Sequence, residues 1–350
     1  MLAAMLGACL PQTTPEPAFT PAAPEPSPSA IVPQETQEPL EGGSRFELQV
    51  PAPALPLIFP TALPEPETTW RPPPYPAPWS LGPYDHFFFN RPIQSNEVNW
   101  PNPLYRYGST MLGEEDMHTG IDISASRGAP VVAAGAGEVL SAGYGLYRGV
   151  EDLTDPYGLA VAIQHDFGYD GKPLYTVYAH MGSIDVWPGA QVEAGQKIGT
   201  VGETGDASGP HLHFEVRLGE NRYFSTRNPE LWLVPYEGWG VLAGWVENSW
   251  GQPLYEQLIE ITSLETGEHW NVWTYARGTV IADDHFGENF VISDLPAGPY
   301  EVQINFVGHA LTAQFYLYPG RVNFLRFEGR SGFVIEPTAT PADLNSPPSR

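Results

Sequence analysis

The amino-acid sequence predicts an all-β protein with two folded blocks that follow a long proline-rich N-terminal region. Its 39 prolines and 36 glycines are more than a fifth of the 350 residues, too many for a protein built mainly of long helices. The apolar residues form short runs or alternate with polar residues, and turn-forming residues separate these runs. Aromatic residues make up 12% of the chain, so the folded part can build hydrophobic cores.

The first nine residues resemble the end of a bacterial lipoprotein signal. Residues 1–8 are apolar, and small residues precede Cys9, the one cysteine of the sequence. The resemblance implies that Cys9 carries a lipid that tethers the protein to a membrane. No Lys or Arg precedes the apolar run, a departure from the pattern that a start codon further upstream would explain. No apolar run reaches the roughly 18–20 residues of a membrane span, so we expect an extracytoplasmic protein of the cell envelope, lipid-anchored or secreted.

Residues 10–83 are expected to form a disordered linker. The first 80 residues contain 20 of the 39 prolines and show no apolar periodicity. Such a segment buries too little apolar surface to offset the entropy of ordering, and it favours extended polyproline-II conformations. We expect residues 331–350 to form a similar disordered tail.

The charge of the chain excludes one class of function. Lys and Arg number 16 against 41 Asp and Glu, which gives a formal net charge of −25. A nucleic-acid-binding protein needs a basic surface, so this class is excluded. The sequence does not indicate an oligomeric state.

Residues 84–237 are expected to form a glycine-rich antiparallel β-sheet. Apolar runs such as 159–163 and alternating runs such as 211–218 have the length of strands, and glycine turns separate them.

Residues 238–330 are expected to form a small β-sandwich. Six or seven short strands at near-regular spacing predict this fold. The stretch 294–300 resembles a turn of carboxypeptidase-regulatory-like and transthyretin-like sandwiches. The expected strands include 244–247, 258–261, 269–273, 290–292, 300–304 and 315–317.

Four histidines and one aspartate of the first block suggest a metal site. His118 and Asp122 are four residues apart, and His180 ends a predicted strand. His211 and His213 share one face of another predicted strand, because side chains alternate along a strand. A catalytic zinc ion takes three protein ligands and keeps one position open. His118, Asp122 and one histidine of the pair would supply them, and the spacing leaves open which one.

Residues 108–217 resemble the LytM-type, or lysostaphin-like, zinc metallopeptidases of peptidoglycan (peptidase M23-like). The resemblance rests on several short segments that occur in the order of that family. These segments are 117–123, 128–131, 178–181, 195–205 and 209–217, the last reading Gly-Pro-His-Leu-His-Phe-Glu-Val-Arg.

The resemblance implies a site and an activity. It makes His118, Asp122 and His213 the zinc ligands. It makes His180 and His211 the catalytic pair, and it leaves open which of the two is the general base. The implied function is zinc-dependent hydrolysis of peptide crosslinks in bacterial cell-wall peptidoglycan, with a metal-activated water attacking the scissile carbonyl. The alternative is a non-catalytic LytM-like envelope-binding or regulatory protein of the amidase-activator type. Such relatives have lost some of these five residues, and this sequence keeps them all.

Overall fold

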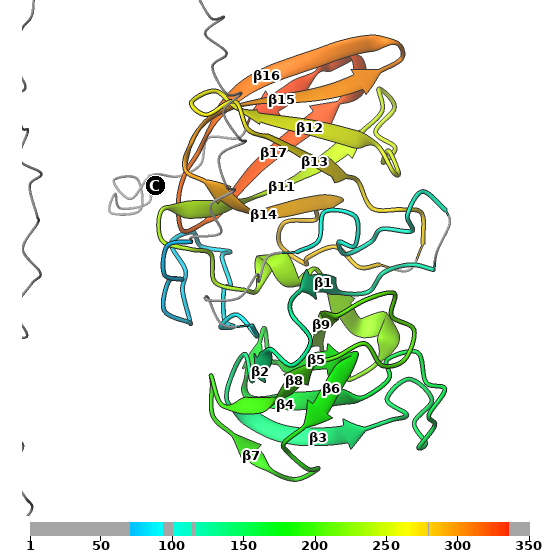
Figure 1. The fold of residues 1–350 in the computed structure, drawn as a ribbon. Coiled ribbons are helices and arrows are strands. Elements are labelled where there is room, and N and C mark those ends of the chain that lie inside the picture. The colour runs from blue at the N-terminus through cyan, green and yellow to red at the C-terminus, as the bar shows by residue number, and fades with distance from the viewer. Residues whose placement is uncertain (1–70, 94–100, 114–115, 279, 336–350) are drawn as a thin grey trace, which may run out of the picture. The chain divides into compact units, whose positions relative to one another are not determined.

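The structure is a computed structural model that describes residues 71–93, 101–113, 116–278 and 280–335 (Figure 1). All of them belong to one compact unit, Pro66–Arg350. The expected signal segment with Cys9, most of the expected linker and most of the expected tail lie outside the described residues.

The described residues confirm the all-β prediction. They contain eighteen strands and three short 3-10 helices, and no α-helix. No helix among them is long and apolar enough to cross a membrane.

Ten short strands form the N-terminal block, the part of the structure up to residue 237. They are β1 (Ile121–Ser124), β2 (Pro130–Val132), β3 (Gly137–Gly143), β4 (Ala160–Tyr169), β5 (Lys172–Ala179), β6 (Met181–Ile184), β7 (Gln191–Val192), β8 (Lys197–Val201), β9 (His211–Leu218) and β10 (Thr226–Arg227). The 3-10 helices η1 (Tyr223–Ser225) and η2 (Pro229–Leu231) lie on either side of β10 in the sequence.

These strands form two antiparallel sheets. The larger has the order β1-β9-β5-β4-β3-β7, with β10 beside β9. The smaller has the order β2-β8-β6. In the larger sheet, His213 of β9 lies opposite Asp122 of β1 on one side and Ala179 of β5 on the other. This register brings three segments of the expected site to one place.

A glycine allows β1 to approach β9 closely. A Cβ atom on Gly120 would lie 2.4 Å from the carbonyl oxygen of Phe214 and 2.9 Å from Nε2 of His213. Both distances are too short for any residue with a side chain. Gly120 therefore sets the spacing between the two strands next to His213.

The second block is a β-sandwich of eight strands. These are β11 (Trp239–Glu247), β12 (Leu258–Ser263), β13 (His269–Trp273), β14 (Phe290–Pro296), β15 (Gly298–Phe306), β16 (His309–Leu317), β17 (Val322–Glu328) and β18 (Phe333–Ile335), with the 3-10 helix η3 (Gly329–Ser331) before β18. One sheet has the order β14-β11-β17-β18 and the other β13-β12-β15-β16. Buried apolar side chains of both sheets, such as Val246 and Ile261, form one core between them, as in other sandwiches.

Two strands of the sandwich were not among those expected from the sequence. β17 pairs with β11 in parallel, although the two strands are far apart in the sequence. β18 pairs with β17 and lies beyond residue 330, where we expected the sandwich to end. Alternation within a segment predicts a strand, but it does not predict which distant strand will pair with it.

A second hydrophobic core joins the N-terminal block to one sheet of the sandwich. Its fully buried members include Phe89, Phe214 and Trp232 of the N-terminal block. Val241 of β11 and Val291 of β14 belong to the same cluster. Water is therefore excluded between the two blocks, which stabilises their association.

Residues 71–83, at the end of the expected linker, lie against the folded chain. Tyr75 donates its backbone N–H to the carbonyl of Pro235 (2.9 Å), and the indole N–H of Trp79 donates to the carbonyl of Gly320 (2.8 Å). The rings of Tyr75 and Trp79 stack with their centroids 4.2 Å apart. Aromatic side chains offer large apolar surfaces, so they order this short stretch despite its prolines.

Candidate metal centre

His118, Asp122 and His213 bring one ligand atom each into a group whose members lie within 4.8 Å of one another. Asp122 and His213 are direct cross-strand partners on β1 and β9. Their Cβ atoms are therefore neighbours on one face of the sheet. His118 precedes β1 and reaches the same point. The structure thus assembles three of the residues singled out in the sequence.

The three ligand atoms have the mutual distances of a metal site. His118 Nε2 lies 3.0 Å from Asp122 Oδ1 and 3.0 Å from His213 Nδ1. Asp122 Oδ1 lies 3.0 Å from His213 Nδ1. Tetrahedral zinc with bonds of about 2.0–2.1 Å holds its ligand atoms about 3.3 Å apart, so the donor set fits this ion in chemistry and in size.

Hydrogen bonds select the ring nitrogen that each histidine offers. Nδ1 of His118 donates to the carbonyl of Arg106 (3.3 Å), which leaves Nε2 as the ligand atom. Nε2 of His213 contacts Glu215 Oε1 (3.2 Å), which leaves Nδ1. Such contacts with the second ring nitrogen are the usual way in which proteins orient metal-binding imidazoles.

His180 and His211 lie beside this group. Their ring centroids are 4.8 Å apart, and His180 lies 5.7 Å from His213. Nδ1 of His180 donates to the carbonyl of Thr204 (2.8 Å), and Nδ1 of His211 donates to that of Gly209 (2.8 Å). Both rings therefore keep Nε2 as an acceptor, and that of His211 lies 3.4 Å from Asp122 Oδ2. All five residues predicted from the sequence thus meet in one pocket.

The electrostatics of the group follow from burial and close charges. Burial, together with the neighbouring rings of His213 and His211, lowers the pKa of His180 to about 3. Burial also acts to lower the pKa of His213, but contacts with Asp122 and Glu215 outweigh it and raise the pKa to about 9. Burial acts to raise the pKa of Asp122, but His118 and His213 hold it well below its usual range.

Glu215 is a functional candidate that the sequence reasoning missed. It is fully buried, and its Oε1 accepts hydrogen bonds from Thr119 Oγ1 (2.6 Å) and the Tyr157 hydroxyl (2.7 Å). Its Oε2 accepts from Arg217 Nε (2.7 Å). Residues 211, 213, 215 and 217 alternate along β9, so the strand period already placed Glu215 on the face of the two histidines.

The pocket around these residues has a volume of about 500 Å³ and is open to solvent. Its lining includes four tyrosines and two exposed aspartates. These are Tyr105, Tyr147, Tyr157, Tyr223, Asp116 and Asp206. The tyrosine walls offer flat apolar surface with hydroxyl groups, which suits an extended peptide.

One wall of the pocket is a loop between β3 and β4 that closes on itself. Asp155 is fully buried, and its Oδ2 accepts the backbone N–H groups of Tyr147 (2.9 Å) and Arg148 (3.1 Å). Its Oδ1 accepts the backbone N–H of Tyr157 (3.0 Å). A single carboxylate thus ties both ends of the wall together.

The glycine-rich antiparallel sheet and the converging His-Asp-His group define an all-β protein with a possible metal site. Residues 116–225 match the family model described as Peptidase family M23. This match, over about a third of the chain, agrees with the family that the sequence resemblance predicted.

Known proteins share this domain over part of their length. The chain is 42% identical over 119 residues to the uncharacterized lipoprotein YgeR of Escherichia coli, which is 34% of this chain and 40% of that protein. It is 36% identical over 137 residues to the murein hydrolase activator EnvC of E. coli, 38% of this chain and 28% of that protein. It is 32% identical over 179 residues to lysostaphin of Staphylococcus simulans, 50% of this chain and 34% of that protein.

Among solved structures, the catalytic domain of lysostaphin from S. simulans is 30% identical, with a TM-score of 0.31. The match covers 36% of this chain and 86% of that one. The chain spans well under half the length of each of the three relatives named above.

Proposed function

We propose that this protein is a zinc-dependent endopeptidase that hydrolyses peptide crosslinks of bacterial cell-wall peptidoglycan. The observation that carries the proposal is the convergence of His118, Asp122 and His213 beside the pair His180 and His211. The match to Peptidase family M23 supports it.

In this proposal His118, Asp122 and His213 would hold the zinc ion. With two neutral imidazoles and one carboxylate as ligands, a bound dication would keep a net positive charge and would supply Lewis-acid chemistry, polarising a carbonyl and lowering the pKa of water. Glu215 fixes the ring of His213 from behind, and Arg106 does the same for His118 through its backbone carbonyl. The ligand atoms are thus oriented before any ion arrives.

His180 and His211 supply the acid–base chemistry. Each ring is held by a hydrogen bond from Nδ1 to a backbone carbonyl, so each presents Nε2 to the pocket as a proton acceptor. One ring takes the proton of the attacking water on Nε2, and only a ring that carries a proton on Nε2 can donate a hydrogen bond to the negative charge that develops on the carbonyl oxygen. Both rings have equivalent backbone anchors, so the geometry does not favour one of them as the base.

The cell envelope is the proposed location. One relative is named a lipoprotein, another a murein hydrolase activator. Attachment through a lipid on Cys9 remains a prediction, since that residue lies outside the described part of the chain.

A second candidate is a regulatory protein without catalytic activity. The similarity to the murein hydrolase activator EnvC favours it. The presence of all five site residues, with both histidines of the catalytic pair in the pocket, favours the enzyme.

Incubation with purified peptidoglycan separates the two candidates. We expect the zinc-loaded protein to release new amino termini, which mass spectrometry of the fragments assigns to a crosslink. A chelator should abolish the release, and so should His118→Ala, because either removes the ion or one of its ligands. His309→Ala is the matched control, since His309 is exposed at the start of β16. A zinc-loaded protein that binds the wall but releases no amino termini would exclude the enzyme and leave the regulator.

A further inference from the structure

The loop at residues 105–113, called the ligand loop below, fixes two of the three candidate ligands. Gly108 donates its N–H to the carbonyl of His118 (2.8 Å), and His118 donates its own to the carbonyl of Ser109 (2.9 Å). The N–H of Asp122 donates to the carbonyl of Tyr105 (3.1 Å). The conformation of this loop therefore sets where His118 and Asp122 stand relative to His213.

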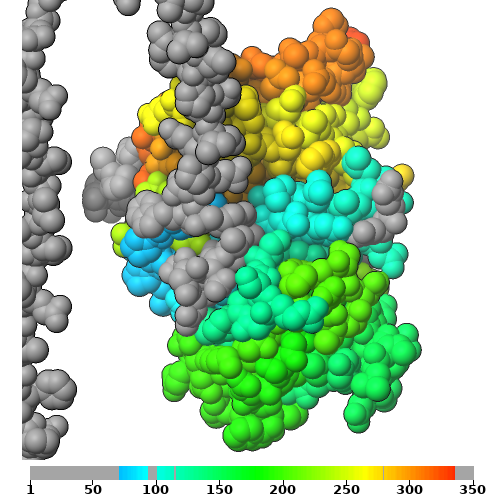
Figure 2. Space-filling view, viewed as in Figure 1, coloured from blue at the N-terminus to red at the C-terminus, as the bar shows by residue number. Residues whose placement is uncertain are grey.

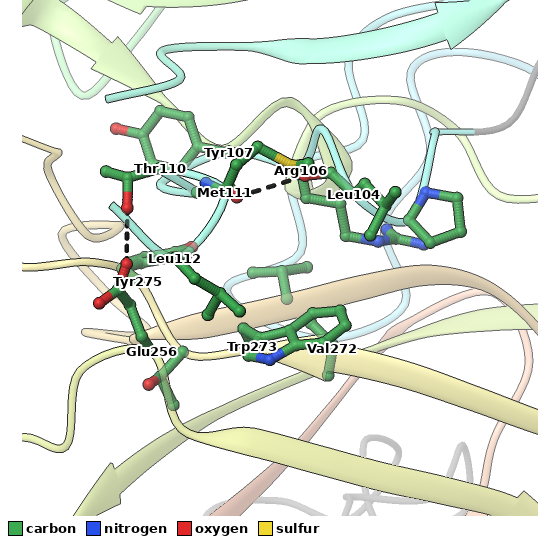
Figure 3. A pocket seen from close by; sticks show the side chains of 14 residues that line it. Leu104, Arg106, Tyr107, Thr110, Met111, Leu112, Glu256, Val272, Trp273 and Tyr275 are labelled. Carbon is green, nitrogen blue, oxygen red and sulfur yellow. Dashed lines mark hydrogen bonds between the residues drawn. The ribbon is translucent and has the colours of Figure 1, made fainter. Parts of the chain in front are cut away.

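The sandwich holds the same loop through hydrogen bonds to three of its residues. Ala276 donates its N–H to the carbonyl of Gly108 (2.8 Å). Gly108 is the residue whose own N–H donates to the carbonyl of His118. Ile281 donates its N–H to the Tyr107 hydroxyl (3.0 Å). The Thr110 hydroxyl donates to Glu256 Oε1 (2.5 Å), as drawn in Figure 3. In Figure 2 the cyan surface of this part of the chain lies between the green N-terminal block and the yellow part of the sandwich.

Side-chain packing supports these bonds on one side of the loop. The rings of Tyr107 and Tyr275 meet edge to face with centroids 5.4 Å apart. Gly108 has a φ of +77°, and a Cβ there would lie 2.6 Å from Cδ1 of Tyr275. A glycine is required both by this backbone conformation and by the close approach of the sandwich.

Packing does not fill the whole space between the loop and the sandwich. A cavity of about 90 Å³ lies between the ligand loop and β13, lined by residues that include Leu104, Met111, Val272 and Trp273 (Figure 3). Because apolar contact is incomplete there, the few hydrogen bonds to the sandwich carry much of the restraint on the loop.

We propose that the C-terminal sandwich is a positioning element of the metal site. Through Glu256, Ala276 and Ile281, it holds the ligand loop in the conformation that points His118 and Asp122 at His213. The inference rests on the proposed function in taking these residues as metal ligands. It gives the sandwich a role within the site, separate from any ligand the sandwich binds.

Two single substitutions test the coupling. Tyr107→Phe removes the hydroxyl that accepts from Ile281 and donates to the carbonyl of Thr226. Glu256→Ala acts from the sandwich side, at a half-buried residue, and removes only the acceptor of Thr110. We expect backbone amides of residues 105–113 and 116–118 to exchange hydrogen about 5-fold faster in the metal-free variants, the effect of one lost hydrogen bond. We expect the dissociation constant for zinc, measured by competition with a chelator, to rise about 3- to 10-fold.

Matched variants show whether the effect is specific. Glu256→Gln keeps an acceptor for Thr110 and should restore both readouts. Tyr300→Phe removes a hydroxyl that donates to the backbone carbonyl of Pro296 inside the sandwich, remote from the ligand loop. It should leave hydrogen exchange in residues 105–113 and 116–118, and zinc affinity, unchanged. Wild-type values in both Tyr107→Phe and Glu256→Ala, or an equal effect of Tyr300→Phe, would overturn the inference.

The outcome is independent of the peptidase test. Hydrogen exchange is measured without metal, and zinc affinity without substrate. A wild-type protein that releases no amino termini from peptidoglycan would contradict the proposed function, whereas the exchange rates of the variants would still decide whether the sandwich holds the loop.

Discussion

The carboxylate of Glu215 is fully buried. It accepts hydrogen bonds from Thr119, Tyr157 and Arg217. It also contacts Nε2 of His213. Burial acts to raise its pKa, but the charge of Arg217 and the contact with His213 lower the pKa below its usual range. A buried carboxylate of this kind stays ionised and holds the imidazole ring in place.

We expect Glu215→Gln to weaken zinc binding by about 10-fold or more, because the amide retains the shape but not the charge that orients His213. The variant should also lose about 3 kcal/mol of unfolding free energy, since Arg217 remains buried without its partner charge. Chelator competition measures the first effect and denaturant titration the second. Glu260→Gln, on β12 of the sandwich, is the control. Zinc affinity unchanged in Glu215→Gln would show that this network serves stability alone.

At the scale of single residues, the sequence predicted the five residues of the candidate site but not the buried residue that supports them. His118, Asp122, His180, His211 and His213 were singled out by their spacing and strand settings, and the family resemblance implied their roles. Glu215 shares the period of β9 but was missed, because a carboxylate in a strand has no metal-site signal of its own.

At the scale of elements, the pairing of β1 with β9 determines whether a metal site exists at all. The register pairs Asp122 with His213, and a shift by one residue would turn Asp122 to the other face of the sheet. Gly120 permits the close approach at the start of this pair.

Gly120→Ala should therefore disturb both the fold and the site. The added Cβ would lie 2.4 Å from a backbone oxygen that cannot move without moving β9. We expect a loss of about 1–3 kcal/mol of unfolding free energy, together with weaker zinc binding. For stability, Gly209→Ala is the control, because a Cβ at that position meets no atom within 4 Å. Equal stability of the two variants would refute the proposed role of Gly120.

The sequence predicted the kinds of element well and their partners poorly. The short runs indicated strands, and the structure has them. The parallel pairing of β11 with β17 could not be predicted from the alternation of apolar and polar residues, because pairing depends on contacts between distant segments. Residues 71–83 were expected to belong to the linker because of their composition. Composition does not show that the indole N–H of Trp79 donates a hydrogen bond to the carbonyl of Gly320.

At the scale of the whole molecule, the described chain should behave as one cooperative unit. Apolar residues of both blocks belong to one core, and the ligand loop is hydrogen-bonded to the sandwich. We expect a single thermal unfolding transition whose calorimetric and van't Hoff enthalpies agree. Two separated transitions in the calorimeter would mean that the blocks unfold independently, contrary to this shared core.

The core that the two blocks share could not be predicted from the sequence. The expected boundary near residue 237 marked a change in the pattern of strands, and two domains were predicted from it. Whether a core is continuous across such a boundary depends on which surfaces meet, and residues such as Phe89 and Val291 are about 200 positions apart.

The loop between β3 and β4, which forms one wall of the pocket, has a consequence for the evolution of this fold. The backbone hydrogen bonds that the carboxylate of Asp155 accepts come from residues of the loop itself and not from the five residues of the candidate site. We expect that the residues between the tied ends can change in length or sequence without moving the candidate ligands, whereas Tyr157 is fixed to the site because its carbonyl accepts the backbone N–H of His180 (2.9 Å). Selection or protein engineering can therefore alter this wall of the pocket while the five residues of the candidate metal centre stay unchanged.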